Sequence, residues 1–154
     1  MKKESSKKTQ NHKFNWEETW FLEKLEYKAS MILELHIVGA KKEPPEDLII
    51  DNVNLGQAYP LVWDTSKKVV VRFFQPLAFQ RLDESFGAEN GGTYTGERFK
   101  IYSDSEYLRY YSKVAFGIVD KPIQHYSFTC SDDIIDILST EGPEIENIQN
   151  APPT

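Results

Sequence analysis

The stretch "QHYSFTCSDDIIDILSTEGPEI", residues 124–145, gathers a histidine, the chain's single cysteine and three aspartates. These residue types could supply a thiol nucleophile with a base, or the ligands of a metal ion. On an extended strand, residues an odd number apart point to opposite faces, so His125 and Cys130 cannot meet at one site. The pattern predicts a polar face with His125, Ser127 and Thr129, and an apolar face with Tyr126, Phe128 and Cys130.

Cys130 is accordingly expected to be buried and inert, with His125 facing the other way. A reactive thiolate requires a cationic neighbour or a helix N-terminus, whereas Asp132 and Asp133 follow Cys130 closely. The two aspartates suit a turn between strands, because Asp side chains bond to their own nearby backbone. One alternative is a metal site built from these aspartates and His125. Another is a helix over 133–139, although the branched residues there favour a strand. We expect no metal and no cofactor.

Arg72 has an unusual position, because it interrupts the apolar run "VVVRFF". It is either an ion-pair partner on a sheet face or a cation in a cleft. Asp83 and Glu84 form an acidic pair at a loop edge; paired carboxylates can hydrolyse glycosides, but adjacent residues on a strand point apart. A cleft for catalysis would draw together Arg72, Glu97, His125 and Asp83. It would indicate a small β-barrel that binds a ligand or acts as a hydrolase.

A tyrosine-rich zone is the best candidate for a recognition surface, because tyrosine combines a large contact area with a polar tip. The zone contains Tyr94, Tyr102, Tyr107, Tyr110 and Tyr111. In the alternative interpretation, Tyr107, Tyr110 and Tyr111 simply cover the sheet. The residues that we predict to bind a partner are Tyr94, Tyr102, Tyr110, Asp83, Glu84, Arg72 and His125.

Common catalytic and ligand-binding motifs are missing from the sequence. "ENGGT" lacks the lysine of a P-loop and the spacing of a dinucleotide fingerprint, and no zinc-protease, esterase or EF-hand signature occurs. A single cysteine excludes an intramolecular disulfide and every multi-cysteine zinc pattern. These absences remove the common enzyme classes, and we assign no catalytic residue.

The chain alternates between short β-prone runs and turns, which predicts about eight to ten short strands. The clearest helix pattern lies near 104–114, where Ser103 and Glu106 form a capping box and an apolar face follows at helical spacing. The strand–helix rhythm of a parallel sheet is missing. We therefore predict an α+β, mostly β fold: an antiparallel sheet curled into a barrel or sandwich, with one short amphipathic helix.

At positions 25–37 the odd-numbered residues are apolar and most even-numbered ones polar, which predicts strands with one buried face. A three-residue loop at 28–30, with Tyr27 opposite Met31, preserves this parity. Residues 16–24 suit a strand or a short helix, and we favour the strand. Further along, "GAKKEPPED" indicates a loop, "LIIDNV" and "LGQAYPLVW" one strand each, and "DTSKK" a turn. Pro76 divides "VVVRFFQPLAFQRL" into two strands or one bent edge strand, because it cannot donate to a central ladder.

The 154-residue chain is expected to form one domain over 14–141, between a disordered basic tail at 1–13 and a loose tail at 142–154. Residues 1–13 carry five lysines and one glutamate, a net charge of +4, which leaves 13 basic and 23 acidic residues, or −10, on the rest. An acidic body repels nucleic acid and suits a basic protein surface. No apolar run approaches the roughly 20 residues that span a membrane, and we expect a cytoplasmic location.

The segments "HYSFTC", "DIIDILST" and "GPEI" resemble the C-terminal part of small, acidic, uncharacterised bacterial proteins, some of which are immunity partners in toxin systems. The resemblance implies an interaction protein and carries no catalytic residue. We therefore expect a non-enzymatic protein-binding module, such as an inhibitor of a toxin. The alternative is the ligand-binding barrel or hydrolase described above. The sequence predicts no oligomeric state.

Overall fold

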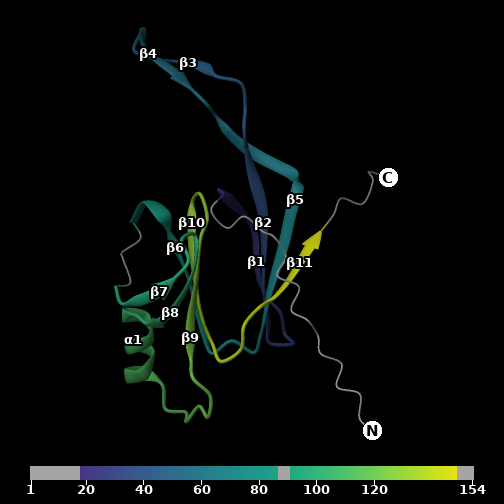
Figure 1. Ribbon diagram of the computed structural model, residues 1–154, viewed down its shortest axis with the longest axis vertical. Helices are drawn as coiled ribbons and strands as arrows, with labels where there is room; N and C mark the ends of the chain where they lie inside the picture. The colour runs from purple at the N-terminus through teal and green to yellow at the C-terminus, as the bar shows by residue number, and fades with distance from the viewer. Residues whose placement is uncertain (1–17, 87–90, 149–154) are drawn as a thin grey trace.

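The computed structural model describes residues 18–86 and 91–148, which fold into two β-sheets, a two-stranded arm and one helix (Figure 1). In chain order the elements are β1 (Trp20–Tyr27), β2 (Ile32–Lys42), β3 (Glu46–Ile50), β4 (Val53–Ala58), β5 (Leu61–Phe74), β6 (Ala78–Asp83), a 3₁₀ turn η1 (Glu84–Phe86), β7 (Thr93–Thr95), β8 (Phe99–Asp104), α1 (Glu106–Val114), β9 (Gln124–Thr129), β10 (Asp133–Ser139) and β11 (Glu144–Ile148). The predicted fold, mostly β with one short helix, is confirmed for these residues.

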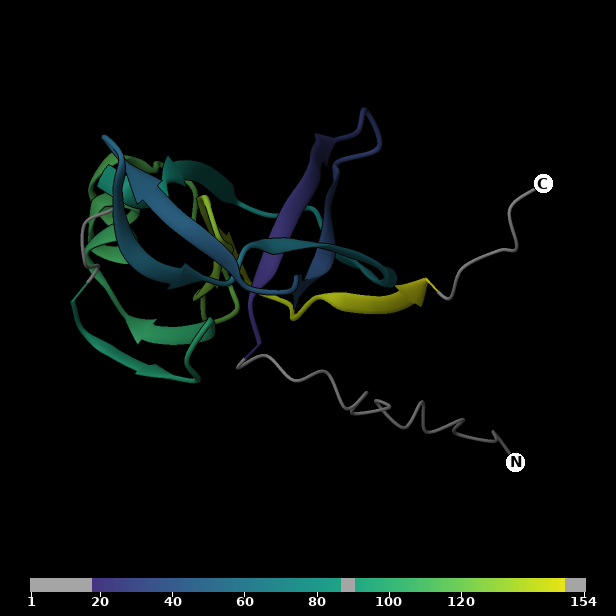
Figure 2. The ribbon, with the colours of Figure 1, turned by 90° about the horizontal axis from the view of Figure 1, so that it is seen from above.

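The two sheets stack as an open sandwich and do not close into a barrel (Figures 1 and 2). The first sheet has the strand order β1-β2-β5-β11, and the second has the order β6-β10-β9-β8-β7. The chain crosses from the first sheet to the second between β5 and β6. Pro76 lies between these strands, so the stretch is divided into two strands and is not one bent edge strand. Helix α1 lies against the outer face of the second sheet, while β2 and β5 extend past the sandwich toward the arm formed by β3 and β4.

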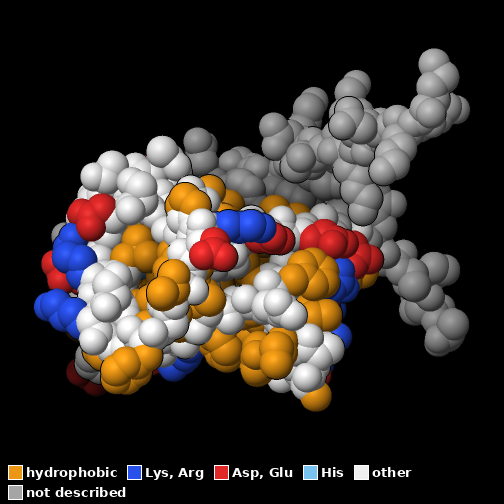
Figure 3. All heavy atoms as spheres, turned by 90° about the horizontal axis from the view of Figure 1, so that it is seen from below, with side chains coloured by type: hydrophobic (Ala, Val, Ile, Leu, Met, Phe, Trp, Pro, Cys, Tyr) orange, Lys and Arg blue, Asp and Glu red, His pale blue; other side chains and the backbone are white. Residues whose placement is uncertain are grey.

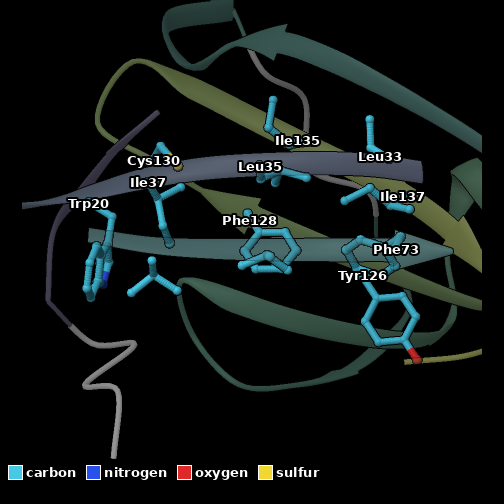
Figure 4. Close-up of a cluster of buried hydrophobic side chains, with 12 residues drawn as sticks. Trp20, Leu33, Leu35, Ile37, Phe73, Tyr126, Phe128, Cys130, Ile135 and Ile137 are labelled. Carbon is cyan, nitrogen blue, oxygen red and sulfur yellow. The ribbon is translucent and has the colours of Figure 1, made fainter. Parts of the chain in front are cut away.

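The core lies between the inner faces of the two sheets (Figure 4). Alternate residues of each strand build it, because successive side chains point to opposite faces. Its main members are Leu33, Leu35 and Ile37 of β2, Val69, Val71 and Phe73 of β5, Tyr126 and Phe128 of β9, and Ile135 and Ile137 of β10. The Phe73 ring lies 5.2 Å from that of Tyr126 and 6.2 Å from that of Phe128, so aromatic contacts join the sheets.

The β1–β2 hairpin keeps the predicted parity but not the predicted register. Tyr27 lies opposite Leu33 rather than Met31, because the turn closes one residue later. The Lys28 amide donates to the carbonyl of Ile32 at 2.9 Å, which leaves a three-residue loop. Met31 takes φ 63°, the left-handed conformation that such loops use at their last position.

The turn predicted at "DTSKK" is wrong, because these residues lie inside the unbroken strand β5. The pairing with β2 changes register there: Val38 pairs with Lys68, whereas the next residue, Gly39, pairs with Asp64. Three extra residues of β5 therefore bulge out while the ladder continues on both sides. A Cβ atom on Gly39 would lie 2.9 Å from Cβ of Lys67, so the glycine leaves room for the bulge.

The single strand predicted at "LIIDNV" is also wrong, since this sequence holds the tip of the β3–β4 hairpin. Asp51 and Asn52 form a two-residue turn with φ values of 49° and 64°, the left-handed values of a type I′ turn. Ile50 and Val53 pair directly on either side of it. The preceding loop is shorter than predicted because β2 runs on to Lys42.

The start of α1 differs from the predicted capping box. The N-cap is Ser105, whose side chain accepts a hydrogen bond from the Leu108 amide, and the helix starts at Glu106. Ser103 is not available as a cap because β8 continues to Asp104. Pairing with a neighbouring strand therefore displaces the cap by two residues.

The loose tail predicted over 142–154 is wrong in part, because β11 pairs with β5 at the edge of the first sheet. Residues 133–139 form strand β10, so the favoured strand is confirmed there. Of the strand favoured over 16–24, β1 confirms 20–24, while residues 16 and 17 lie outside the described residues. The predicted basic tail, 1–13, lies outside the described residues. Within the described residues, the helix is too short and too polar to cross a membrane.

Replacing Phe73 with alanine is expected to lower the free energy of unfolding by about 3–5 kcal/mol, because it opens a cavity at the contact between the sheets. Phe74→Ala, one residue further along β5, removes a ring that is 47% exposed and is expected to cost about 1 kcal/mol. Urea unfolding of the two variants measures the difference. Equal losses would contradict the proposed core.

Candidate functional site

A chain of buried polar side chains lies beneath α1, on the outer face of the second sheet. Ser105 caps the helix, His125 belongs to β9 and Asp136 to β10. The Ser105 Oγ atom lies 2.8 Å from His125 Nδ1, and His125 Nε2 lies 2.6 Å from Asp136 Oδ1. None of the three residues has exposed surface. They form the most deeply buried polar cluster identified among the described residues.

The side chains of this network satisfy one another. Asp136 accepts hydrogen bonds from His125, from Ser127 and, at 3.0 Å, from the Gln80 amide. An ionised Asp136 favours a proton on His125 Nε2, which leaves Nδ1 as the ring atom that meets the Ser105 hydroxyl. Burial acts to raise the pKa of Asp136, but the hydrogen bonds outweigh it and the pKa lies below its ordinary value.

Serine, histidine and aspartate are also the residue types of a hydrolase triad. In such a triad the histidine offers Nε2 to the serine and Nδ1 to the aspartate, whereas the two nitrogens are exchanged here. A nucleophile must also reach a substrate, but Ser105 is fully buried and its Oγ already binds the first turn of α1. We therefore assign the network a structural role, fastening the helix to the sheet.

Two tyrosines enclose the His125 ring. Tyr102 stacks on it with centroids 4.7 Å apart, and Tyr107 of α1 meets it edge-on at 5.4 Å. Burial, together with the charge of Asp136, raises the pKa of Tyr107 to about 12. The contact with His125 shows that Tyr107 covers the sheet, as the alternative interpretation predicts, whereas Tyr110 is 61% exposed and does not fit it.

An ionic cluster lies on the outer face of the first sheet, around the buried Glu34 of β2. Arg72 of β5 lies opposite Glu34 in register, with its Nε 2.5 Å from Glu34 Oε2, and also reaches Glu146 of β11 at 2.5 Å. Lys28 Nζ lies 2.6 Å from Glu34 Oε1. Hydrogen bonds from Lys28 and Arg72 outweigh burial and lower the pKa of Glu34 to about 2. Arg72 is thus an ion-pair partner on a sheet face.

Glu26, Glu34 and His36 bring three possible metal-ligand atoms within 4.8 Å of one another. Both oxygens of Glu34 already bind cationic side chains, and Lys24 pairs with Glu26 at 2.8 Å. These positive charges repel a metal ion. The buried Nε2 of His36 has no hydrogen-bond partner among the described residues and lies 3.6 Å from Glu34. We assign this cluster to ion pairing.

Cys130 lies in the core and His125 on the opposite face of the second sheet, as predicted. Burial, with a smaller effect of Asp133, raises the pKa of the Cys130 thiol to about 12. Asp133 itself pairs with Arg81 of β6. A small pocket beside the thiol is lined by Trp20, Ile37, Arg98, Phe128, Thr129 and Cys130. Because the thiol stays protonated, this pocket contains no thiolate nucleophile.

The residues of the predicted cleft are not brought together. Arg72 lies on the outer face of the first sheet and His125 on the outer face of the second, with the core between them. Glu97 is exposed in the turn between β7 and β8. Asp83 and Glu84 are exposed near the end of β6, where Asp83 accepts a hydrogen bond from the backbone.

The predicted recognition residues differ in exposure. Tyr94 and Tyr110 are exposed, and Lys100 lies over the Tyr94 ring at 4.5 Å. Tyr102 and His125 are buried, so their prediction as partner-binding residues is corrected. Both side chains serve instead as packing and hydrogen-bonding groups under α1.

The arm exposes an apolar surface that sequence reasoning missed. Ile50 pairs with Val53, and Leu48 and Leu55, two residues further along each strand, follow on the same face. With Ile49, these residues are between 43% and 60% exposed. Tyr59, Leu61 and Trp63, which follow the arm in sequence, are exposed as well. The pattern that could have revealed the arm is the Asp-Asn turn between two apolar runs.

Comparison with protein-family models, with curated proteins and with solved structures found no match to this chain. The resemblance of the C-terminal segments to small bacterial proteins therefore stays a prediction.

Replacing Ser105 with alanine is expected to lower the free energy of unfolding by about 1–2 kcal/mol, because the helix loses its cap and His125 loses a partner. Ser112→Ala is the matched control, since Ser112 is exposed on the same helix and its hydroxyl donates to the Leu108 carbonyl. It is expected to change stability by less than about 0.5 kcal/mol. Labelling of Ser105 by a fluorophosphonate in the folded protein would contradict the structural role.

Stability is expected to fall in acid through the Glu34 cluster. The pKa of Glu34 is lowered from 4.5 to about 2 in the fold, so the unfolded chain takes up the proton first as pH falls. The stabilisation is complete above pH about 4.5 and is lost as pH approaches about 2. Urea unfolding across this range should show a shallower loss for Glu34→Gln than for the wild type. Glu46→Gln, on the arm, should leave the profile unchanged, and a shallower loss there would contradict the assignment.

Proposed function

We propose that this chain is a non-enzymatic protein-binding module that uses the β3–β4 arm to engage its partner. The observation that carries the proposal is the exposed apolar face of the arm, formed by Leu48, Ile50, Val53 and Leu55. Contiguous apolar surface of this kind marks interaction sites in soluble proteins. An isolated two-stranded hairpin is also marginally stable in water, so contact with a partner would stabilise the arm.

The charge of the arm indicates the chemistry of the partner. Residues 46–58 contain Glu46, Asp47 and Asp51 and no lysine or arginine, a net charge of −3. A complementary surface has an apolar groove for the exposed face and basic residues along its rim. A toxin with a basic surface would meet this description, and the chain would then be its immunity-type inhibitor.

The shape of the arm supports insertion into a groove. β3 and β4 pair only with each other among the described strands, so each has one free edge with unpaired backbone groups. A partner strand at either edge could add backbone hydrogen bonds to the apolar contact. The arm also projects beyond the sandwich, where the two sheets do not obstruct a partner (Figure 1).

The proposal is tested by affinity capture from the native host at low salt with three baits. The baits are the wild type, a Val53→Asp/Leu55→Asp variant of the arm, and Tyr110→Asp on α1. Both arm side chains are more than half exposed, so the arm variant keeps the fold. We expect one protein to be retained by the wild type and by Tyr110→Asp, and lost from the arm variant.

Salt provides the second readout. Because charge contributes to the contact, the captured protein should elute as ionic strength rises. Identical capture by all three baits would contradict a role for the arm. Loss from Tyr110→Asp alone would assign binding to the tyrosine surface instead.

A further inference from the structure

Large apolar side chains are exposed at the end of the sandwich opposite the arm. Turns at 28–31, 75–77, 115–123 and 140–143 lie at this end (Figure 1). The exposed apolar residues in or beside these turns, here called the basal surface, are Tyr27, Met31, Phe74, Phe79, Phe116 and Ile118. Figure 3 views the molecule from this end and shows hydrophobic patches among charged side chains.

Part of the basal surface consists of side chains that connect the two sheets at this end of the core. The rings of Tyr27 in β1 and Phe79 in β6 lie 5.4 Å apart, although they belong to different sheets. The Gln75 amide donates to the Met31 carbonyl at 2.8 Å, which fixes the first two turns beside each other. This patch is therefore set by the rigid sandwich.

The turn between α1 and β9 adds the most exposed apolar residues of the basal surface. Phe116 and Ile118 are 105% and 95% exposed, so neither side chain is sheltered by the rest of the chain. They flank Gly117 in a segment that is neither helix nor strand. Water solvates such a pair poorly, which favours a contact with another molecule.

Charge distinguishes the occupants of the two apolar surfaces. The four basal turns contain two basic residues, Lys28 and Lys121, and two acidic ones, Asp120 and Glu141, so their net charge is zero. Lys121 pairs with Glu141 at 2.9 Å, and Lys28 pairs with Glu34. The net charge is −6 for the whole chain and −3 for the arm. A second copy of this acidic chain is therefore repelled by the arm but not by the neutral basal turns.

We infer that the basal surface joins two copies of this chain in a two-fold symmetric dimer. Two-fold contacts place the same patch of each copy against the other, and they are the commonest form of self-association. A neutral apolar patch on an otherwise acidic protein is the surface that meets this requirement. The inference goes beyond the proposed function, because it leaves both arms free at opposite ends of the dimer.

Sedimentation velocity of the full chain, from low to high micromolar concentration, tests the inference. We expect a reversible monomer–dimer equilibrium for the wild type. The Phe116→Ser/Ile118→Ser variant should raise the dissociation constant by more than about tenfold, because it removes two apolar side chains from the contact. Both residues are fully exposed in the monomer, and circular dichroism and thermal unfolding check that the variant stays folded.

Val53→Asp/Leu55→Asp on the arm is the matched control and should leave the dimer unchanged. Added salt should not dissociate the dimer, because salt screens the repulsion between two acidic copies. At the arm, by contrast, salt screens an attraction and should weaken the contact with a basic partner. A monomer at every concentration, or loss of the dimer in the arm variant, would overturn the inference. Failure of partner capture would count against the proposed function alone, and failure of dimerisation against this inference alone.

Discussion

The pairing of β2 with β5 is the constraint on which the rest of the structure depends. It places Leu33, Leu35 and Ile37 beside Val71 and Phe73 on the inner face, and Glu34 opposite Arg72 on the outer face. The same two strands run on, past a bulge, into the base of the arm. One ladder therefore sets the core, the ionic cluster and the direction in which the arm leaves the sandwich.

The second sheet depends on a different kind of contact where it meets α1. No residue of this nine-residue helix is itself buried, and isolated helices of this length are marginal in water. The polar network through Ser105 and His125, with the Tyr107 ring against the histidine, holds the helix in place. A buried network that is fully paired specifies one orientation, which apolar contact alone leaves less defined.

Strand parity is the part of this fold that sequence predicts well, because it needs no knowledge of the neighbours. It correctly separates Cys130 from His125. It does not reveal that His125 meets Ser105 and Asp136, since these residues lie on three elements whose pairing is set at long range. The bulge in β5 and the strand β11 were missed for the same reason: a continuous partner strand overrides local turn-forming residues.

The bulge in β5 has a consequence for how such a protein can change over time. It lies beside Gly39, at the point where the ladder passes from the sandwich to the arm. Bulges bend a strand and increase its twist, so gaining or losing a residue here would swing the arm to a new angle while every core pair stays intact. This joint lets the direction of the arm vary independently of the contacts that stabilise the core.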